Sequence, residues 1–485
     1  MENRQEVLIK KLINLHPLNT IKNIISPKEK IYLVGGSIRD FLLGKRIKDF
    51  DLITNKNPFS IVKRIAKSLN GKFFKFKDFN YRIIYKENHI VKNIDFSRFI
   101  ENTLLKNLNT RDFTINALAL EVNNPCFIDP CNGIKDLTQK TLRVINSSSF
   151  VKDPLRLLRA IRLSAQLKFK IEDKTRESIT KLAPLIKEVS REGILNELCL
   201  ILKNKKSFYF LKQLYELDLL IYIIPEFAFF YDSLFNSQEI WLHSLNSLKE
   251  LENILENLSW YFPEYHKKIK QYLRKKQVGN RNNLVLLKLA IFLHDIGKPL
   301  TKSLDKKGKF HYTSHQEVGK TLAHIICKHL SLSNQEIECL TQTIKHHMQI
   351  GYFSNCNNLS SKALWRFYKK IGSNLVNIVL LSLADSKETY SQEQKLDLKK
   401  HQGFSRDLLQ KYFEKDKDFY PKTFINGNDL IKYFNLSPGP IFKTILNEAI
   451  FAHIDGKIKN KKEALKYIEL KYNLQQSSIL AKAKE

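Results

Sequence analysis

Short runs of apolar and aromatic residues, separated by polar turns, occupy the first quarter of the chain and predict β-strands. The clearest runs are Ile31–Val34, Lys72–Phe76, Tyr81–Tyr85 and Val91–Phe96. A further strand is expected to carry Asp49 and Asp51, and a helix is expected to contain Arg39 and to end near Gly44. This stretch is therefore predicted to form a small mixed α/β unit.

Beyond about residue 135 the apolar positions recur at helical spacing, and strand patterns fade. Helices are expected at Leu155–Leu167, Thr175–Ile186, Ile194–Leu202 and Phe208–Leu220, with further helices to the end of the chain. The predicted fold class is α+β, with a small mixed head followed by a long all-helical body.

Five parts are expected along the chain. They are an N-terminal helix and loop (1–29), the mixed head (30–135), a helical neck (136–225), a larger helical domain (226–415) and a basic helical tail (416–485). The last two boundaries are placed at a polar hinge near 225–240 and at a turn-rich stretch near 416–429, because turn-forming residues interrupt the periodicity there.

The head contains a pattern typical of a phosphate and metal site. Gly35 and Gly36 follow the first strand, where glycine lets the chain turn and lets backbone N–H groups approach a ligand. Asp49 and Asp51 are two positions apart in a strand, so their carboxylates share one face. Like charges this close favour a bound cation, and Mg²⁺ prefers carboxylate, phosphate and water oxygens. The pattern predicts transfer of a phosphoryl or nucleotidyl group.

The composition indicates a polyanionic partner. The 485 residues include 81 Lys plus Arg against 49 Asp plus Glu, a formal net charge of +32, which suits nucleic acid. A general lysine bias is the alternative explanation. Six cysteines without a paired spacing indicate reduced thiols, and the N-terminus has no apolar signal core. We expect a cytoplasmic protein with no membrane partner, and the sequence indicates no obligate protein partner.

Five ordered motifs resemble those of the class II tRNA nucleotidyltransferases and bacterial poly(A) polymerases, which have a polymerase-beta-like head. The first runs from Leu33 through the Gly-Gly turn to Asp51. The others are Arg111–Ala117, Asp129–Leu137, Asp153–Arg162 and Arg191–Glu197. The resemblance covers about residues 30–200.

The resemblance implies a role for each motif residue. Asp49, Asp51 and Asp95 would be catalytic, with Mg²⁺ bound at the first two, although a strand-end turn is the alternative for Asp95. The expected nucleotide-binding residues are Gly35, Gly36, Arg39, Arg111, Asp112, Asn116, Asp153, Arg156, Arg159 and Arg162. An internal salt bridge that stiffens the head is the alternative role for Asp112.

Asp153 and Arg156 are expected to select the base. Asp153 is predicted to cap the helix that follows, with Pro154 in its first turn. Residues three apart share a helix face, so Arg156 lies beside it. A carboxylate accepts from an exocyclic amine and a guanidinium donates to a ring acceptor, as cytosine and adenine require. Lys152 stands where the family commonly has Glu, which changes the local charge.

The segment between Asp95 and Arg111 is short. Only residues 96–110 separate them, and the family's flexible loop between these motifs has little room. Relatives with a shortened loop divide the work of CCA addition. Addition of the two cytidines alone is therefore a second hypothesis for the product.

A second constellation occurs in the helical body. His294 and Asp295 follow an apolar helix, with His243 earlier and Asp385 later. This set resembles the ligands of the HD phosphohydrolases and implies a divalent metal. His315 and His346 fall where a second metal's ligands lie in some members of that superfamily.

The sequence thus predicts a template-independent tRNA nucleotidyltransferase that uses CTP and ATP and grips the acceptor and T arms. The lysine-rich tail suits contact with the tRNA backbone. Two alternatives remain open, which are a poly(A) polymerase on the same fold and a metal-dependent HD phosphohydrolase whose head binds RNA.

Overall fold

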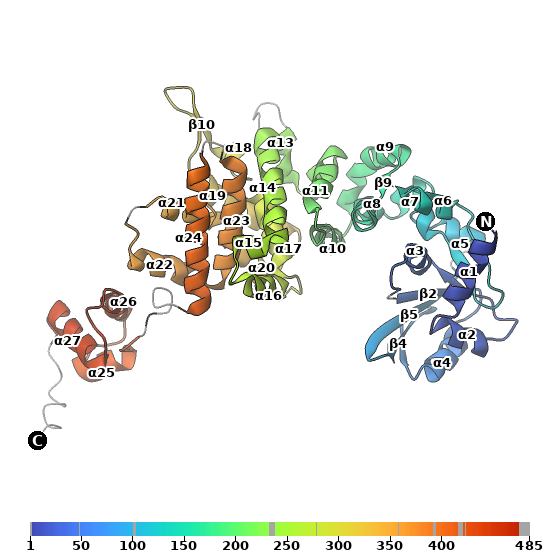
Figure 1. Ribbon diagram of the computed structural model, residues 1–485, viewed down its shortest axis with the longest axis horizontal. Coiled ribbons are helices and arrows are strands. Elements are labelled where there is room, and N and C mark those ends of the chain that lie inside the picture. The colour runs from blue at the N-terminus through green and yellow to red at the C-terminus, as the bar shows by residue number, and fades with distance from the viewer. Residues whose placement is uncertain are drawn as a thin grey trace, which may run out of the picture. The chain divides into compact units, whose positions relative to one another are not determined.

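The computed structural model forms two compact units, Met1–Pro225 and Glu226–Glu485 (Figure 1). The residues that it describes are 2–47, 49–99, 103–231, 238–277, 279–356, 358–390, 394–415, 421 and 423–474. Parts of the expected boundary segments, residues 232–237 and 416–420, lie outside the described residues. Among the described residues, no helix combines the length and the apolar content that crossing a bilayer requires.

The first unit begins with α1 (Glu2–Ile13) and α2 (Leu18–Ile24) and is built on a seven-stranded sheet. Its strands are β1 (Ile31–Val34), β2 (Asp49–Thr54), β3 (Lys72–Lys77), β4 (Asn80–Glu87), β5 (Ile90–Arg98), β6 (Ala119–Glu121) and β7 (Phe127–Ile128). They lie in the order β3-β4-β5-β2-β1-β6-β7, and β2 and β5 form a parallel pair. All the strands predicted in the head are confirmed.

The two faces of the sheet differ because successive strand residues point to opposite sides. One face carries buried apolar side chains, including Phe50, Leu52, Ile94 and Phe96. Helix α4 (Phe59–Ser68) packs against β3 and β4 on this side. The opposite face carries Asp49 and Asp51, so the core fixes the direction in which the carboxylates point.

The neck consists of short helices after the sheet. They are α7 (Ser148–Lys152), α8 (Leu155–Leu167), α9 (Asp173–Leu182), α10 (Arg191–Leu202), α11 (Ser207–Glu216) and α12 (Leu219–Ile223). The bounds predicted for α8 are confirmed. The helix predicted at Thr175–Ile186 changes to a 3₁₀ helix at Ala183–Glu188, where Pro184 cannot continue the α-helical hydrogen bonds. The helix predicted at Phe208–Leu220 is interrupted by Asp218, whose φ is +55°.

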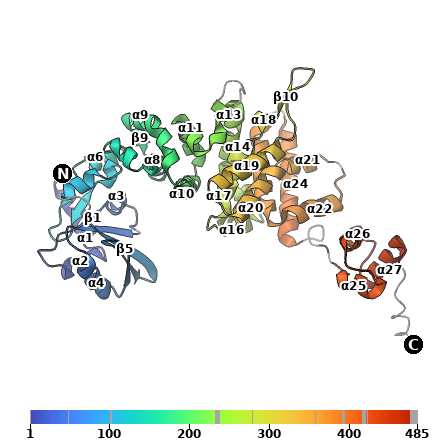
Figure 2. The same ribbon diagram turned by 180° about the vertical axis from the view of Figure 1, so that it is seen from behind.

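The second unit packs around α17 (Asn283–Leu293), which is buried on all sides. It contacts α14 (Gln238–Glu256), α20 (Asn334–His346) and α23 (Leu375–Thr389). Figure 2 shows α20 beside α19 (His315–His329), and the two helices are in contact. The helix α24 (Lys395–Glu414) packs on α23.

The predicted α+β class, a mixed head followed by a helical body, is confirmed, although the body also contains short strands that were not predicted. A hairpin joins β10 (Lys302–Leu304) to β11 (Phe310–Tyr312), and β8 (Thr141–Leu142) pairs with β9 (Lys170–Ile171) in the neck. Three helices near the C-terminus, α25 (Gly427–Phe434), α26 (Pro440–Ile454) and α27 (Lys461–Tyr472), share a core of their own.

Candidate active site and candidate metal centre

The three predicted carboxylates lie together on the open face of the sheet. Asp49 and Asp51 are on β2, and Asp51 pairs directly with Asp95 on the parallel strand β5. Asn93 precedes Asp95 on the same face, and its amide donates to the Asp49 carboxylate at 3.1 Å. The sheet register therefore places all three acidic groups side by side.

Among the three carboxyl groups, that of Asp51 has a clearly raised pKa. Burial raises the pKa of its carboxyl to about 6, and the charges of Asp95 and Asp49 act in the same direction, while Arg111 opposes them. A carboxylate with a raised pKa beside two others is an environment that a divalent cation neutralises. The donor set, all carboxylate oxygens, also fits the ligand preference of Mg²⁺.

Asp95 has a partner that the sequence did not reveal. The Arg82 side chain on β4 donates to both of its oxygens, from Nε at 2.6 Å and from Nη2 at 2.7 Å. This pairing depends on the register of β4 against β5, in which Arg82 lies opposite Asp95. Asp95 thus lies beside Asp51, but its carboxylate is hydrogen-bonded to the Arg82 guanidinium. Its catalytic role stays a prediction.

The glycine turn makes room for an arginine. Gly35 has φ of +73°, and a side-chain Cβ there would lie 2.6 Å from Nη1 of Arg111. Glycine is therefore required both for the backbone conformation and for the close approach. Burial lowers the pKa of Arg111, and its Nε is buried without a hydrogen-bond partner among the described residues. Its Nη1 donates to the backbone carbonyl of Asn116 at 3.4 Å, and the side chain lines a cavity described below.

Asn116 connects this turn to the second motif. Its side-chain oxygen accepts a hydrogen bond from Arg39 Nη1 at 2.7 Å, and its amide donates to Asp112 at 2.9 Å. Arg39 also forms an ion pair with Asp40 at 2.9 Å. Asn116 therefore fixes the orientation of Arg39 on α3 (Gly36–Leu42), which begins at the turn.

Asp112 is mainly occupied within the protein. Besides Asn116, it accepts from the backbone N–H of Phe113 at 2.9 Å and lies 3.4 Å from Arg159 Nη1. Glu197 on α10 pairs with Arg162 at 2.5 Å and with Arg159 at 3.8 Å. These contacts join the head to the neck, and they match the internal salt bridge considered for Asp112. Direct contacts of these residues with a nucleotide stay predictions.

Asp153 does not cap α8, contrary to the prediction. The helix begins at Leu155, and Pro154 occupies the cap position. The Asp153 carboxylate instead lies 3.3 Å from Arg156 Nε, while Arg156 Nη1 donates to the carbonyl of Thr110 at 3.0 Å. Asp153 and Arg156 therefore lie side by side as an ion pair, and Thr110 fixes the guanidinium, while their role in base selection stays a prediction.

Two adjoining cavities are lined by most of these groups, although Asp95 and Asp153 line neither of them. A cavity of about 330 Å³ is lined by cationic and polar side chains, which are Arg39, Arg111, Asp112, Asn116, Arg156, Arg159 and Arg162, together with Gly36 and Leu163. A second cavity of about 530 Å³ contains Asp49 and Asp51 and shares Gly36 and Arg39 with the first. An arginine-rich cavity beside paired carboxylates can hold a polyphosphate against a metal site.

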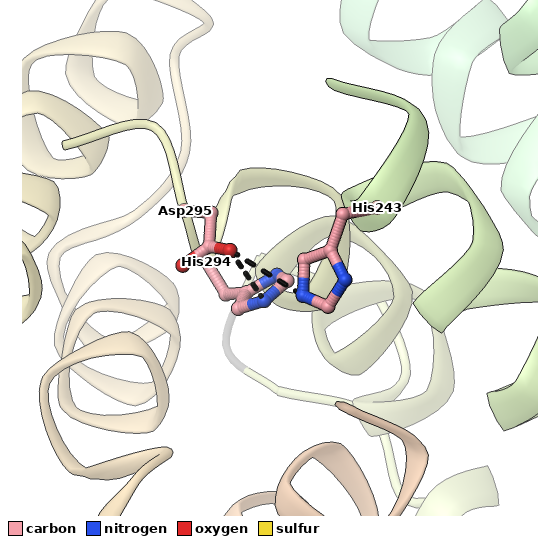
Figure 3. Close-up of side chains that lie close together, drawn as sticks. All are labelled: His243, His294 and Asp295. Atoms are coloured by element: carbon pink, nitrogen blue, oxygen red, sulfur yellow. Dashed lines mark ion pairs between the residues drawn. The ribbon is translucent and has the colours of Figure 1, made fainter. Parts of the chain in front are cut away.

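The second constellation also comes together in space. Figure 3 shows His243 of α14 facing His294 and Asp295, which follow the last turn of α17. His243 Nε2 lies 3.5 Å from Asp295 Oδ2 and 2.9 Å from Asp385 Oδ1 on α23. Nε2 of His294 lies 3.3 Å from Asp295 and 3.5 Å from Asp385. All four predicted ligands therefore converge.

The additional histidines are His315 and His347, not His315 and His346 as predicted. The potential ligand atoms of Asp295, His315 and His347 lie within 4.8 Å of one another, as do those of His294, His347 and Asp385. His346 instead packs edge-on against Phe367. His346 and His347 are adjacent in the sequence. His346 is the last residue of α20 and His347 follows it, and in this arrangement His347 is the one that faces the cluster.

Charge distribution in this cluster suits a metal. Burial alone lowers the pKa of His243, but hydrogen bonds to Asp385 and Glu388 outweigh it and raise the pKa to about 9. The pKa values of Asp295 and Asp385 are low because their histidine partners outweigh the cost of burial. His294 Nε2, Asp295 Oδ1 and His315 Nε2 are buried without a hydrogen-bond partner among the described residues. These orphaned atoms fit a divalent cation.

The cluster opens into a cavity of about 720 Å³ whose lining includes His315, His347 and Asp385. Two further residues that contact the cluster were not predicted from the sequence. Lys298 Nζ lies 2.5 Å from Asp295 Oδ2, and Glu388 hydrogen-bonds Nδ1 of His243. Glu388 is three residues after Asp385 on α23, a helical spacing that could have revealed it.

Three parts of the chain match models of known families. Residues 31–143 match the model "Poly A polymerase head domain", and residues 168–230 match "Probable RNA and SrmB-binding site of polymerase A". Residues 313–468 match "tRNA nucleotidyltransferase domain 2 putative".

The chain is also similar to curated proteins over most of its length. It is 26% identical to the CC-adding tRNA nucleotidyltransferase of Synechocystis, covering 90% of this chain and 92% of that protein. The CC-adding enzyme of Thermus thermophilus is 26% identical, with 91% and 94% covered. The A-adding enzyme of Deinococcus radiodurans is 25% identical, with 90% and 94% covered.

The fold is that of solved CCA-adding enzymes. The structure of the Thermotoga maritima CCA-adding enzyme complexed with tRNA superposes with a TM-score of 0.63 at 21% identity, covering 96% of this chain and 98% of that one. A structure of a CCA-adding enzyme with CTP gives a TM-score of 0.67 at 20% identity, with 96% and 98% covered.

Proposed function

Because the chain belongs to the family of tRNA nucleotidyltransferases and bacterial poly(A) polymerases, we propose that it adds cytidine and adenosine nucleotides to tRNA 3′ ends without a nucleic-acid template. The observation that carries the proposal is the row of Asp49, Asp51 and Asp95 beside an arginine-lined cavity. The tRNA enzymes that it resembles match along nine-tenths of the chain.

Enzymes of this family use divalent metal ions, and we propose Mg²⁺ at Asp49 and Asp51. When bound there, the metal would supply charge stabilisation at the attacking 3′-hydroxyl and at the triphosphate. Arg39 and Arg111 would hold the triphosphate, since both line the cavity next to the carboxylates. Arg111 is suited to this role because the Gly35 turn admits its guanidinium.

The base would be selected by Asp153 and Arg156, which are paired at 3.3 Å. We expect Asp153→Ala to lower the preference for CTP over UTP about tenfold or more, because the acceptor for the exocyclic amine is lost. The preference is measured as the ratio of kcat/KM values for single-nucleotide addition. Asp173→Ala, which changes an exposed carboxylate on α9, is the control, and an unchanged ratio in Asp153→Ala would exclude this role.

The product is tested with tRNA that lacks its CCA end. The protein is incubated with CTP alone and with CTP plus ATP, and the 3′ ends are sequenced. Complete CCA with both nucleotides is the expected result. Long adenosine tails would instead identify a poly(A) polymerase and overturn the proposal.

Addition of CC alone is a second candidate, and the short segment 96–110 favours it. Part of this segment forms the end of β5 and the helix α5 (Leu104–Asn109), which leaves few residues for a long flexible loop. Residues 100–102 lie outside the described residues. Products that stop at CC in the presence of ATP would select this candidate.

The second unit would add a metal-dependent phosphohydrolase site. His243, His294, Asp295 and Asp385 would hold one divalent metal, and the orphaned atoms of His294 and Asp295 support this assignment. A bound metal there would supply a water nucleophile at neutral pH for a phosphoester. Hydrolysis at this second site would not require Asp49 and Asp51, which belong to the first unit.

The remaining proposals concern the tRNA and the compartment. Among the lysines near the C-terminus, Lys457 and Lys459 are exposed in the connection between α26 and α27, and Lys462 is exposed on α27. They would contact the acceptor and T arms through phosphates. All six cysteines are free thiols, which supports a reducing compartment such as the cytoplasm.

A further inference from the structure

The open face of the sheet extends from the carboxylates to the edge strand β3. Residues that pair across neighbouring strands point to the same face. Asp51 pairs with Asp95, Asp95 with Arg82, and Arg82 with Phe74 of β3. A phenylalanine at the edge of the sheet is therefore in the same row as the candidate catalytic carboxylates.

A second row confirms the common face. Asp49 pairs with Asn93, Asn93 with Ile84, and Ile84 with Lys72. The hydrogen bond from Asn93 to Asp49 shows that these side chains do point to one side.

This part of the face is exposed and aromatic. Phe74 and Phe76 are 46% and 52% exposed, whereas Ile83 on the opposite face is fully buried. The Arg82 guanidinium lies 5.9 Å from the ring centroid of Phe76, so the two phenylalanines flank a fixed cation. Exposed aromatic side chains that gather in one place mark an interaction surface more often than single apolar residues do.

Protection of a sheet edge explains only part of this pattern. Lysines on edge strands prevent pairing with other chains, and Lys72 serves that purpose. Phe74 and Phe76 have the opposite effect, because exposed aromatic residues on an edge favour association. Aromatic rings combined with Lys72, Arg82 and Lys86 instead form the type of surface that binds single-stranded nucleic acid, by stacking and by phosphate contact.

We propose that this face binds the single-stranded 3′-terminal nucleotides of the RNA that is being extended, an inference that rests on the proposed function. Three strand spacings separate Phe74 from Asp51, about 14 Å, a distance that a few nucleotides span. The terminal hydroxyl lies at the carboxylates, Arg82 contacts a phosphate, and the preceding bases stack on Phe74 and Phe76. Arg82 is held in place for this contact by Asp95.

The test compares two RNA substrates in the double variant Phe74→Ala/Phe76→Ala. With tRNA that already carries added cytidine, we expect KM for the RNA to rise about tenfold. The rise is smaller with tRNA lacking all three terminal nucleotides, because its shorter end does not reach Phe74. KM for CTP and the unfolding temperature stay at the wild-type values. The variant Phe74→Trp/Phe76→Trp retains the stacking surface and is expected to bind both RNAs like the wild type.

Phe59→Ala is the matched control. Phe59 is 48% exposed on α4, but it packs against Phe73 and Tyr81 on the covered side of the sheet. An unchanged KM for both RNAs in the double alanine variant would overturn the inference, as would a change in self-association without a change in RNA binding. Failure of the proposed function is distinguishable, since the wild-type protein would then not extend tRNA at all.

Discussion

Replacement of Asp51 by asparagine is expected to lower nucleotide incorporation by at least about a thousandfold. The amide keeps the shape of the side chain but loses the charge that binds a divalent cation. Asp49→Asn is expected to have a similar effect, because both carboxylates face the same cavity. The measurement is single-turnover addition of labelled CMP to tRNA that lacks its CCA end.

The loss is expected without a loss of stability. The folded-state pKa of Asp51, about 6, lies above the value of 3.8 for an ordinary aspartate. Ionisation of Asp51 therefore lowers the free energy of unfolding. This loss grows as the pH rises from 3.8 to about 6 and is complete at higher pH. In the presence of a chelator at pH 7.5, Asp51→Asn should unfold at the wild-type temperature or higher.

Asp173→Asn serves as the control for this pair, because Asp173 is an exposed carboxylate in the same unit. It should retain both wild-type activity and wild-type stability. If Asp51→Asn incorporated CMP within tenfold of the wild-type rate, the assignment of the metal site to β2 would be wrong.

The elements around this site were predictable because their signals are local. The apolar run at β1, the glycine turn and the alternation along β2 each depend on a few adjacent residues. The side of the strand on which Asp49 and Asp51 lie follows from Phe50 and Leu52, which are buried between and beyond them. The reason why position 35 must be glycine was only partly visible, since the contact with Arg111 is distant in sequence.

The role of Arg82 was not predicted, because its partner is distant in the sequence. Arg82 reaches Asp95 only because β4 and β5 pair in one particular register. Asp153 was predicted to cap α8, but Pro154 occupies the cap position, and the Asp153 carboxylate lies 3.3 Å from Arg156, the neighbour that the helix spacing predicted. At both positions the local pattern is compatible with more than one partner.

The hairpin β10–β11 was missed for a different reason. Its strands contain three residues each, too few for an alternating pattern to be recognised. The turn did carry a signal, because Asp305 accepts from the backbone N–H groups of Lys307 and Lys309, and Gly308 adopts a φ of +75°. Asp and Gly at such positions are typical of turns.

The second large effect is expected in the second unit. His294→Ala should abolish binding of a divalent metal at the histidine cluster and lower hydrolysis of bis-p-nitrophenyl phosphate at least about a hundredfold. His294 is fully buried at the centre of the ligand set, between Asp295 and Asp385. Addition of CMP to tRNA should stay at the wild-type rate, because Asp49 and Asp51 belong to the other unit. Bound metal is measured by elemental analysis of the purified protein.

The adjacent pair His346 and His347 provides a sharper form of this experiment. His347→Ala removes a ring that lies 5.1 Å from the His294 ring and is expected to lower bound metal and hydrolysis together. His346→Ala removes a ring of the same size that contacts Phe367, so stability falls while metal content does not. Since both histidines are buried, loss of packing affects both variants, and only ligation distinguishes them. Equal loss of metal in the two variants would mean that the cluster responds to packing alone and would refute the metal centre.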